Sequence, residues 1–155
     1  MRTGVDLVRE QLTIAAGEPL SLRQSDIVPR GVAIECRVNV EDPDRDFAPT
    51  PGVLAEFRPP SGPFVRVDTH GFPGYRVPAN YDSLLAKTIV WAPDRDQALA
   101  RMSRALDEFR VGGPGIATTI GFFQGVLAHP LFRTAKYDTT FTDVVLSERT
   151  QSTVE

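Results

Sequence analysis

The segment from Val32 to Val40 alternates apolar and polar residues without interruption, and this alternation constrains the fold more than any other feature of the sequence. Successive side chains of a β-strand point to opposite faces, so the pattern predicts a half-buried strand. The apolar face carries Val32, Ile34, Cys36, Val38 and Val40, and the other face carries Ala33, Glu35, Arg37 and Asn39. A sheet with one covered face is therefore expected.

Three further segments are predicted to be strands. Residues 53–58 form a short strand, closed by the Pro-rich segment 59–63, and residues 64–70 alternate again. Residues 83–91 are apolar on both faces, which is typical of a central strand covered on both sides. The segment 41–52 is rich in Asp and Pro and is expected to be a loop.

Apolar residues at helical spacing predict three helices. The first covers residues 3–16, with Thr3 and Asp6 as a capping pair and Gly17 as its stop. The second begins after its candidate N-cap, Asp94, and the third covers residues 119–128. The buried stripe of the second helix is expected to contain Leu99, Met102, Leu106 and Phe109. The element order predicts an α+β fold: an antiparallel sheet with flanking helices in one domain, residues 1–146, followed by a frayed tail, residues 147–155.

Charge and cysteine content exclude several classes of protein. The net charge of −3 argues against a broad electrostatic contact with nucleic acid. Cys36, the single cysteine, has no partner for an internal disulfide and cannot form a zinc knuckle, which favours a reducing compartment. No apolar run approaches the roughly 18 residues of a membrane span, and the N-terminus has no apolar signal region. A cytoplasmic protein without membrane or nucleic-acid partners is therefore expected.

No local motif predicts a phosphate loop, a metal site or a nucleophile. The glycines of segment 112–115 are not followed by Lys and Ser or Thr, so a turn is expected there. His70 and His129 are far apart and share no ligand spacing, so no metal site is predicted. Cys36 lies on the apolar face of its strand and is expected to be a small core residue.

Ionisable residues on two strands form the one constellation that suggests chemistry. Arg66, Asp68 and His70 share a strand face by the period of two, as do Glu35 and Arg37. If these strands are neighbours, the five groups converge. The alternative is a solvated sheet face with weak ion pairs, each worth about 0–1 kcal/mol; the pattern alone favours that alternative.

Several long stretches resemble the C-terminal domain of biotin carboxylases. GVAIECRVN at 31–39, followed by EDP, is similar to the family's strand H-A-x-E-x-R-x-x-A/V-E-D-P, with Val32 in place of the usual His. YRVPANYDSLLAK at 75–87 is similar to Y-x-V-P-x-x-Y-D-x-x-x-x-K. The other matching stretches, which extend the resemblance over residues 1–145, are 3–20, FAPTPG at 47–52, VRVD at 65–68 and 116–122.

The resemblance implies the family's fold and assigns roles to individual residues. Family members use ATP and bicarbonate to carboxylate N1 of biotin for acetyl-, propionyl- or pyruvate-type carboxylases. Arg66 matches the arginine that faces the biotin ureido oxygen, and a guanidinium suits a developing oxyanion. Tyr81 and Asp82 match positions near the cleft, and Lys87 matches the strand behind it. Trp91 and Arg95 match a two-fold contact, which implies a homodimer.

The resemblance also shows what the sequence lacks. Residue 1 falls after the family's metal-binding glutamates, its bicarbonate-binding loop, its glycine-rich lid and its ATP lysines. The chain alone is therefore expected to bind no cofactor and to be inactive in carboxylation, although biotin, ATP, Mg²⁺ and bicarbonate serve the intact enzyme. A biotin carboxyl carrier domain and a separate ATP-grasp half are its candidate partners.

Three functions remain open at this point. The chain is part of a biotin carboxylase, or a repurposed stand-alone enzyme that performs ATP-independent acid–base or oxyanion chemistry on a small metabolite, or a non-catalytic binding module. The beginning at Met1 favours a stand-alone protein. The candidate site residues are Arg66, His70 and Tyr81 for catalysis, Asp68, Asp82, Glu35 and Arg37 for substrate binding, and Trp91 and Arg95 for the dimer interface.

Overall fold

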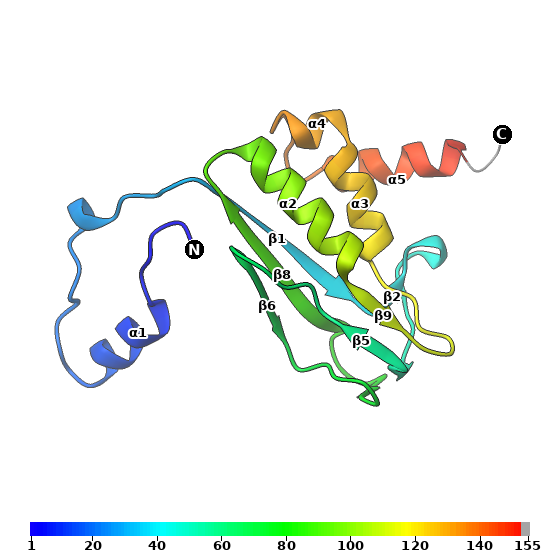
Figure 1. The fold of residues 1–155 in the computed structure, drawn as a ribbon, viewed down its shortest axis with the longest axis horizontal. Coiled ribbons are helices and arrows are strands. Elements are labelled where there is room, and N and C mark those ends of the chain that lie inside the picture. The colour runs from blue at the N-terminus through cyan, green and yellow to red at the C-terminus, as the bar shows by residue number, and fades with distance from the viewer. Residues whose placement is uncertain (153–155) are drawn as a thin grey trace.

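The computed structural model describes the backbone of residues 1–152 and the side chains of residues 1–149. A three-stranded antiparallel sheet joins β1 (Val32–Asn39), β8 (Leu84–Ala92) and β6 (Val65–Thr69) in the order β1-β8-β6. Figure 1 shows helices lying against this sheet. The predicted α+β fold with an antiparallel sheet and flanking helices is confirmed.

Smaller two-stranded ladders extend the sheet at one end. They pair β2 (Glu41–Asp42) with β3 (Ala48–Pro49), β4 (Gly52–Val53) with β7 (Arg76–Val77), and β5 (Glu56–Arg58) with β9 (Arg110–Gly112). The single strand predicted over residues 53–58 is therefore two strands with different partners. Between them, Leu54 donates its amide to the Tyr75 carbonyl, and this turns the chain.

The core lies between the sheet and α2 (Arg95–Glu108), whose predicted N-cap Asp94 accepts a hydrogen bond from the Gln97 amide at 2.9 Å. The four residues of the predicted buried stripe are at most 3% exposed. Leu99, Met102 and Leu106 pack in one cluster with Ile34 and Cys36 of β1, and Phe109 packs in a second cluster with Val38. Cys36 is 4% exposed, so its predicted place in the core is confirmed. Beside α2 lies α3 (Ile120–Ala128) (Figure 1).

The C-terminal segment is helical up to Ser152. After α4 (Pro130–Arg133), helix α5 spans Phe141–Ser152, beyond the expected start of a frayed tail at Ser147. Residues 153–155 of that tail lie outside the described residues. Segment 41–52, predicted to be a loop, contains the 3₁₀ turn η2 (Pro43–Arg45) between the short strands β2 and β3. Arg149 of α5 forms an exposed ion pair with Asp44 of this turn at 2.7 Å.

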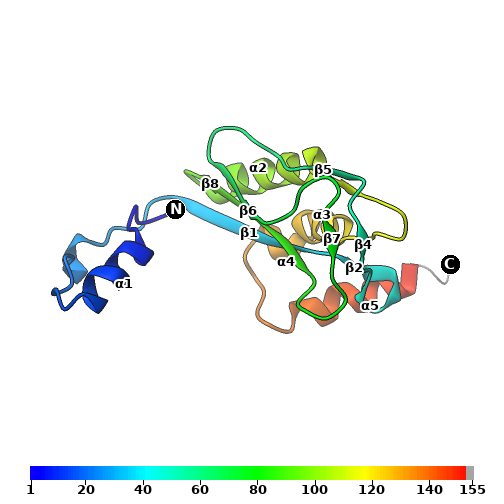
Figure 2. The same ribbon diagram turned by 90° about the horizontal axis from the view of Figure 1, so that it is seen from below.

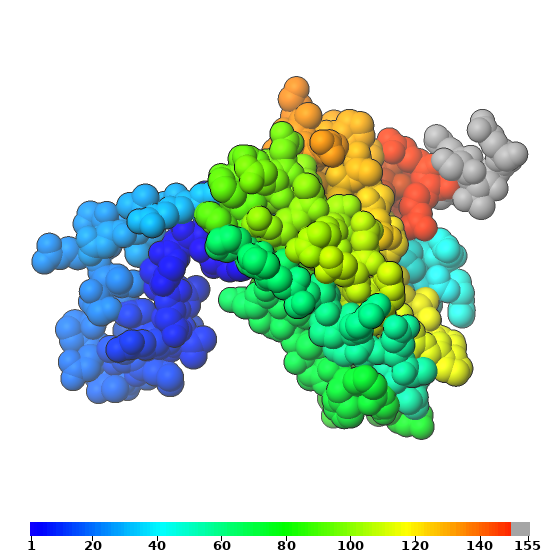
Figure 3. All heavy atoms as spheres, in the orientation of Figure 1, coloured from blue at the N-terminus to red at the C-terminus, as the bar shows by residue number. Residues whose placement is uncertain are grey.

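Residues 1–30 form an arm that stands apart from the rest of the structure (Figures 2 and 3). Its helix α1 (Leu7–Ala15) is followed by the 3₁₀ turn η1 (Gln24–Asp26). Helix α1 begins four residues later than predicted, because Asp6 accepts a hydrogen bond from the Arg9 amide and acts as the N-cap. None of its residues is buried.

Candidate functional site

The strand register creates a charged face on the sheet, opposite the face that α2 covers. In one cross-strand row Glu35, Ile89 and Arg66 are partners, and in the next row Arg37, Lys87 and Asp68 are partners. Residues directly opposite one another in an antiparallel ladder share a face. The predicted groups of β1 and β6 therefore lie on one surface, although the strands are not neighbours and β8 separates them.

Arg66 and Asp68 form an ion pair on this charged face. Arg66 Nη2 lies 3.1 Å from Asp68 Oδ2, and the two side chains are 54% and 50% exposed. Such exposure limits the pair to about 0–1 kcal/mol of stability. Its structural effect is to hold the guanidinium above the sheet, with donors left for a ligand.

Among the described residues, His70 makes no ion pair or hydrogen bond with Arg66 or Asp68. Strand β6 ends at Thr69, whose hydroxyl donates to the Leu85 carbonyl at 2.8 Å and accepts from the Gly71 amide at 2.9 Å. The chain then leaves the sheet, and the His70 ring packs edge-on against Tyr75 at 5.2 Å. The predicted trio of Arg66, Asp68 and His70 is thus reduced to an ion pair.

Tyr81 and Asp82 lie in the connection between β7 and β8. Tyr81 is 82% exposed. Asp82 accepts a hydrogen bond from the Leu84 amide at 2.7 Å, which shapes the turn into β8. Among the described residues no hydrogen bond or ion pair joins either side chain to Arg66.

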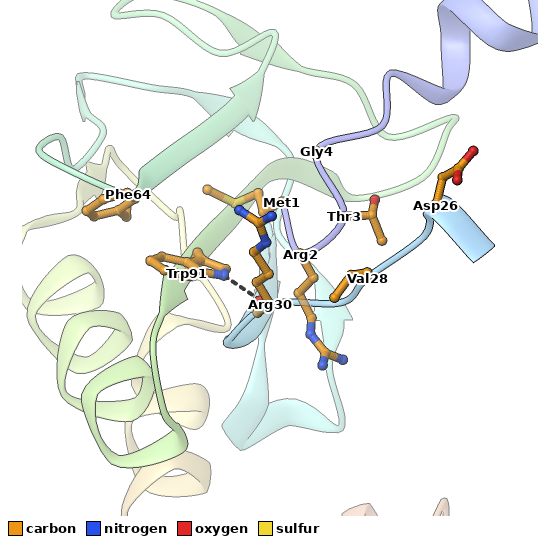
Figure 4. A pocket seen from close by; sticks show the side chains of 9 residues that line it. All are labelled: Met1, Arg2, Thr3, Gly4, Asp26, Val28, Arg30, Phe64 and Trp91. Atoms are coloured by element: carbon orange, nitrogen blue, oxygen red, sulfur yellow. Dashed lines mark hydrogen bonds between the residues drawn. The ribbon is translucent and has the colours of Figure 1, made fainter. Parts of the chain in front are cut away.

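Trp91, predicted at a dimer interface, also anchors the arm. Its indole Nε1 donates to the Arg30 carbonyl at 2.8 Å, and the Arg30 amide donates to the Arg2 carbonyl at 2.9 Å. Figure 4 shows Trp91, Phe64 and Arg30 around the pocket between arm and sheet. The Phe64 and Trp91 ring centroids are 5.1 Å apart.

Arg95, the second predicted interface residue, is engaged within the chain. Its Nε donates to the Arg133 carbonyl at 3.0 Å, and its Nη2 donates to the Phe132 carbonyl. Its guanidinium carbon lies 5.0 Å from the centroid of the Phe132 ring. Arg95 therefore links α4 to the start of α2. Its guanidinium is already hydrogen-bonded within the chain, so it is not free to bind a second subunit without giving up these contacts.

The remaining chemistry of the described residues is limited. Burial, with a smaller contribution from Glu35, raises the pKa of the Cys36 thiol to about 12, so this cysteine stays protonated at neutral pH. No group of three or more His, Cys, Asp or Glu side chains could hold a metal ion within the described part of the chain. No described helix is both long and apolar enough to cross a membrane.

Lys87 belongs to the charged face but was not among the site residues predicted from the sequence. It lies at the centre of the second row, between Arg37 and Asp68, and its side chain is half-buried. The apolar neighbours of Lys87 predicted a covered strand and drew attention away from it. The pairing register with β1 and β6 places Lys87 beside Arg37 and Asp68, and this register cannot be read from a single sequence.

Comparison with known proteins agrees with this architecture. The family model described as the biotin carboxylase C-terminal domain matches residues 35–144. The biotin carboxylase of Nostoc sp. is 51% identical over 141 residues, which cover 91% of this chain and 31% of that protein. The biotin carboxylase of Pseudomonas aeruginosa is 58% identical over 113 residues, covering 73% of this chain and 25% of that protein.

A solved structure shows the same fold in a larger enzyme. The biotin carboxylase domain dimer of Hydrogenobacter thermophilus 2-oxoglutarate carboxylase, in complex with MgADP and bicarbonate, superposes with a TM-score of 0.89 at 40% identity. The match covers 94% of this chain and 32% of that chain. The matches thus cover between a quarter and a third of the length of these relatives. On sequence and fold together, the chain belongs to the biotin carboxylase C-terminal domain family.

Proposed function

We propose that the chain forms one wall of a biotin carboxylase site and presents Arg66 to the ureido oxygen of biotin. The observation that carries the proposal is the ion pair between Arg66 and Asp68 on an exposed sheet face. The Arg66 side chain is 54% exposed. Removal of the N1 proton moves negative charge onto the ureido oxygen. A guanidinium placed there stabilises this charge, and Asp68 positions the guanidinium.

The chain needs the remaining part of the enzyme for the ATP-dependent step. Transfer of a phosphoryl group to bicarbonate depends on a divalent metal and on groups that hold phosphates. The described residues do not fit a metal site, because no suitable acidic or histidine cluster occurs among them. We therefore assign ATP, Mg²⁺ and bicarbonate to a preceding ATP-binding portion, in the same polypeptide or in a partner.

The proposed assembly is a cytoplasmic homodimer that acts on biotin attached to a carrier domain. The Hydrogenobacter thermophilus relative is a dimer, and the resemblance assigns Trp91 and Arg95 to the two-fold contact. The separate-enzyme hypothesis has less support, because among the described residues no hydrogen bond or ion pair joins His70, its proton-transfer group, to Arg66. Nothing in the geometry favours a non-catalytic module over the carboxylase role.

A chimeric enzyme tests the proposal. The region of the Nostoc biotin carboxylase that precedes the match would be joined to this chain, which is 51% identical to the segment it replaces. We expect bicarbonate-dependent ATP hydrolysis that free biotin stimulates. Arg66→Ala should lower the biotin-stimulated rate by roughly 10²-fold or more, as for other oxyanion donors.

The matched control is Arg104→Ala, which removes an arginine that pairs with Glu108 on the outer face of α2 at 2.8 Å. This variant should keep the wild-type response to biotin. Equal biotin stimulation in the Arg66→Ala and Arg104→Ala chimeras, with both proteins folded, would refute the assignment of Arg66.

A further inference from the structure

Two cations stand directly opposite one another on the charged face. Arg37 of β1 and Lys87 of β8 are partners in the register, and such side chains have Cβ atoms about 4.5–5.5 Å apart. Within the described residues, neither head group makes an ion pair or a hydrogen bond. Like charges in this arrangement destabilise a sheet, so the pair has a cost in the free chain.

The nearby carboxylates do not remove this cost. Asp68 is the other cross-strand partner of Lys87, but its carboxylate is bound by Arg66 at 3.1 Å. Glu35 lies two residues along β1, in the neighbouring row. One carboxylate therefore remains for two cations, and the surface around Arg37 and Lys87 keeps an excess of positive charge.

The surroundings also favour attraction of an anion over full solvation. Lys87 is half-buried, and Ile89, two positions further along β8, is 7% exposed although it lies on the charged face. The stems of the neighbouring long side chains cover such a residue while their head groups stay in water. Lower local polarity strengthens the attraction between the cations and an anion placed between them.

We propose that Arg37 and Lys87 form an oxyanion-binding pair that takes a carboxylate or a phosphate group between them. The guanidinium offers planar paired donors and the ammonium adds a compact charge, so one oxyanion satisfies both. The row of Arg37 and Lys87 is offset from the row of Arg66 by two residues, about 7 Å in the strand direction at 3.4 Å per residue. The proposal concerns binding by the chain itself and does not rest on the carboxylase role of Arg66.

The first test follows backbone amide NMR signals of the full chain during titration with phosphate or with acetate, with ionic strength held constant by sodium chloride. We expect saturable shifts around Arg37, Lys87 and Asp68, with a dissociation constant on the order of 1 mM. A tenfold preference for phosphate would identify a phosphate group as the ligand, and comparable affinities would identify a carboxylate-sized site. Uniform, unsaturated shifts across the sheet would overturn the proposal.

Variants separate a built site from general screening. Lys87→Met and Arg37→Met should each weaken binding at least fivefold, whereas Lys87→Arg should retain it. Arg104→Met, on the outer face of α2, is the matched control and should bind as the wild type does. Loss of binding in the control variant, or full binding in Lys87→Met, would overturn the assignment.

A stability measurement distinguishes this role from a structural one. In chloride alone, Lys87→Met should raise Tm because it removes the like-charge contact, and added phosphate should narrow the difference by stabilising only the wild type. A lower Tm for Lys87→Met in chloride would mean that Lys87 is a structural partner of Asp68 or Glu35, which contradicts the proposal. Both tests use the chain alone, so failure of the chimeric enzyme would leave their outcome interpretable.

Discussion

Helix α1 of the arm and helix α2 of the sheet domain are both amphipathic, but the apolar residues of α1 are exposed and those of α2 are buried. In α2 the apolar residues Leu99, Met102 and Leu106 are at most 3% exposed. In α1 the apolar residues Leu7, Val8 and Leu12 are 65–71% exposed. Amphipathic helices derive most of their stability from packing, so α2 is held by the core whereas α1 depends on its cap and on local hydrogen bonds.

This difference shows which part of the chain forms a buried core. The described core clusters use buried residues from Ile34 to Val145, and the family model matches residues 35–144. The 141 residues aligned with the Nostoc biotin carboxylase amount to 91% of the chain, so the alignment must include much of the arm as well. In the structure the apolar residues Leu7, Val8 and Leu12 of α1 remain exposed, although the alignment with a relative about three times longer extends into the arm.

The largest contrast is expected from deleting one leucine side chain in each helix. Leu106→Ala removes a residue that is 1% exposed and should lower the free energy of unfolding by about 2–5 kcal/mol. Leu12→Ala shortens a side chain that is 67% exposed and should change the free energy of unfolding by less than about 0.5 kcal/mol. Urea denaturation of both variants measures the difference. Similar losses of unfolding free energy in the two variants would show that α1 packs on the sheet domain in solution.

The sequence predicted those elements whose pattern is complete within one segment. The alternation from Val32 placed β1 to within one residue at its end, and Asp94 marked the start of α2. The apolar segment at 83–91 is the central strand, as predicted, because β8 has neighbours on both sides. Each of these signals depends on residues a few positions apart.

Features that depend on distant residues were not predictable in this way. The period of two continued to His70, but the hydroxyl of Thr69 bonds to Leu85 and ends β6. The helical pattern identified α1, yet no pattern within the arm indicates whether a neighbour covers it. For the site, the sequence named both members of the Arg66–Asp68 pair, whereas Lys87 became evident when the register placed it beside Arg37.

A smaller effect is expected at the junction between arm and domain. Gly31 has φ +60°, and an added Cβ would lie 2.8 Å from the Trp91 ring and close to the Ala92 carbonyl. Gly31→Ala should therefore lower the free energy of unfolding by about 1–3 kcal/mol if the junction keeps its geometry. The loss should be smaller if the arm detaches from the sheet domain. Proteolysis within residues 1–30 should accelerate, and Trp91 fluorescence should change because its hydrogen bond to Arg30 is lost.

Gly17→Ala provides the control for this junction, because Gly17 also has positive φ but has nothing near its would-be Cβ. It should strain α1 locally without altering the environment of Trp91. Unchanged fluorescence and cleavage in Gly31→Ala would show that the arm is not held through this contact.

The smallest effect is expected from the two helix caps, and it depends on pH. Hydrogen bonds from the Gln97 amide and side chain lower the pKa of Asp94 below its usual value of 3.8. A carboxyl whose pKa is lower in the folded state adds stability above its unfolded pKa and loses it as pH falls through the folded pKa. Asp94→Ala should thus lower Tm at pH 7, and the deficit should shrink below about pH 4.

Asp6→Ala should reduce α1 helicity, measured by circular dichroism, and leave Tm unchanged, since α1 buries no residue. A Tm decrease in Asp6→Ala as large as that in Asp94→Ala would mean that arm and domain unfold as one unit, and the comparison between them would then fail.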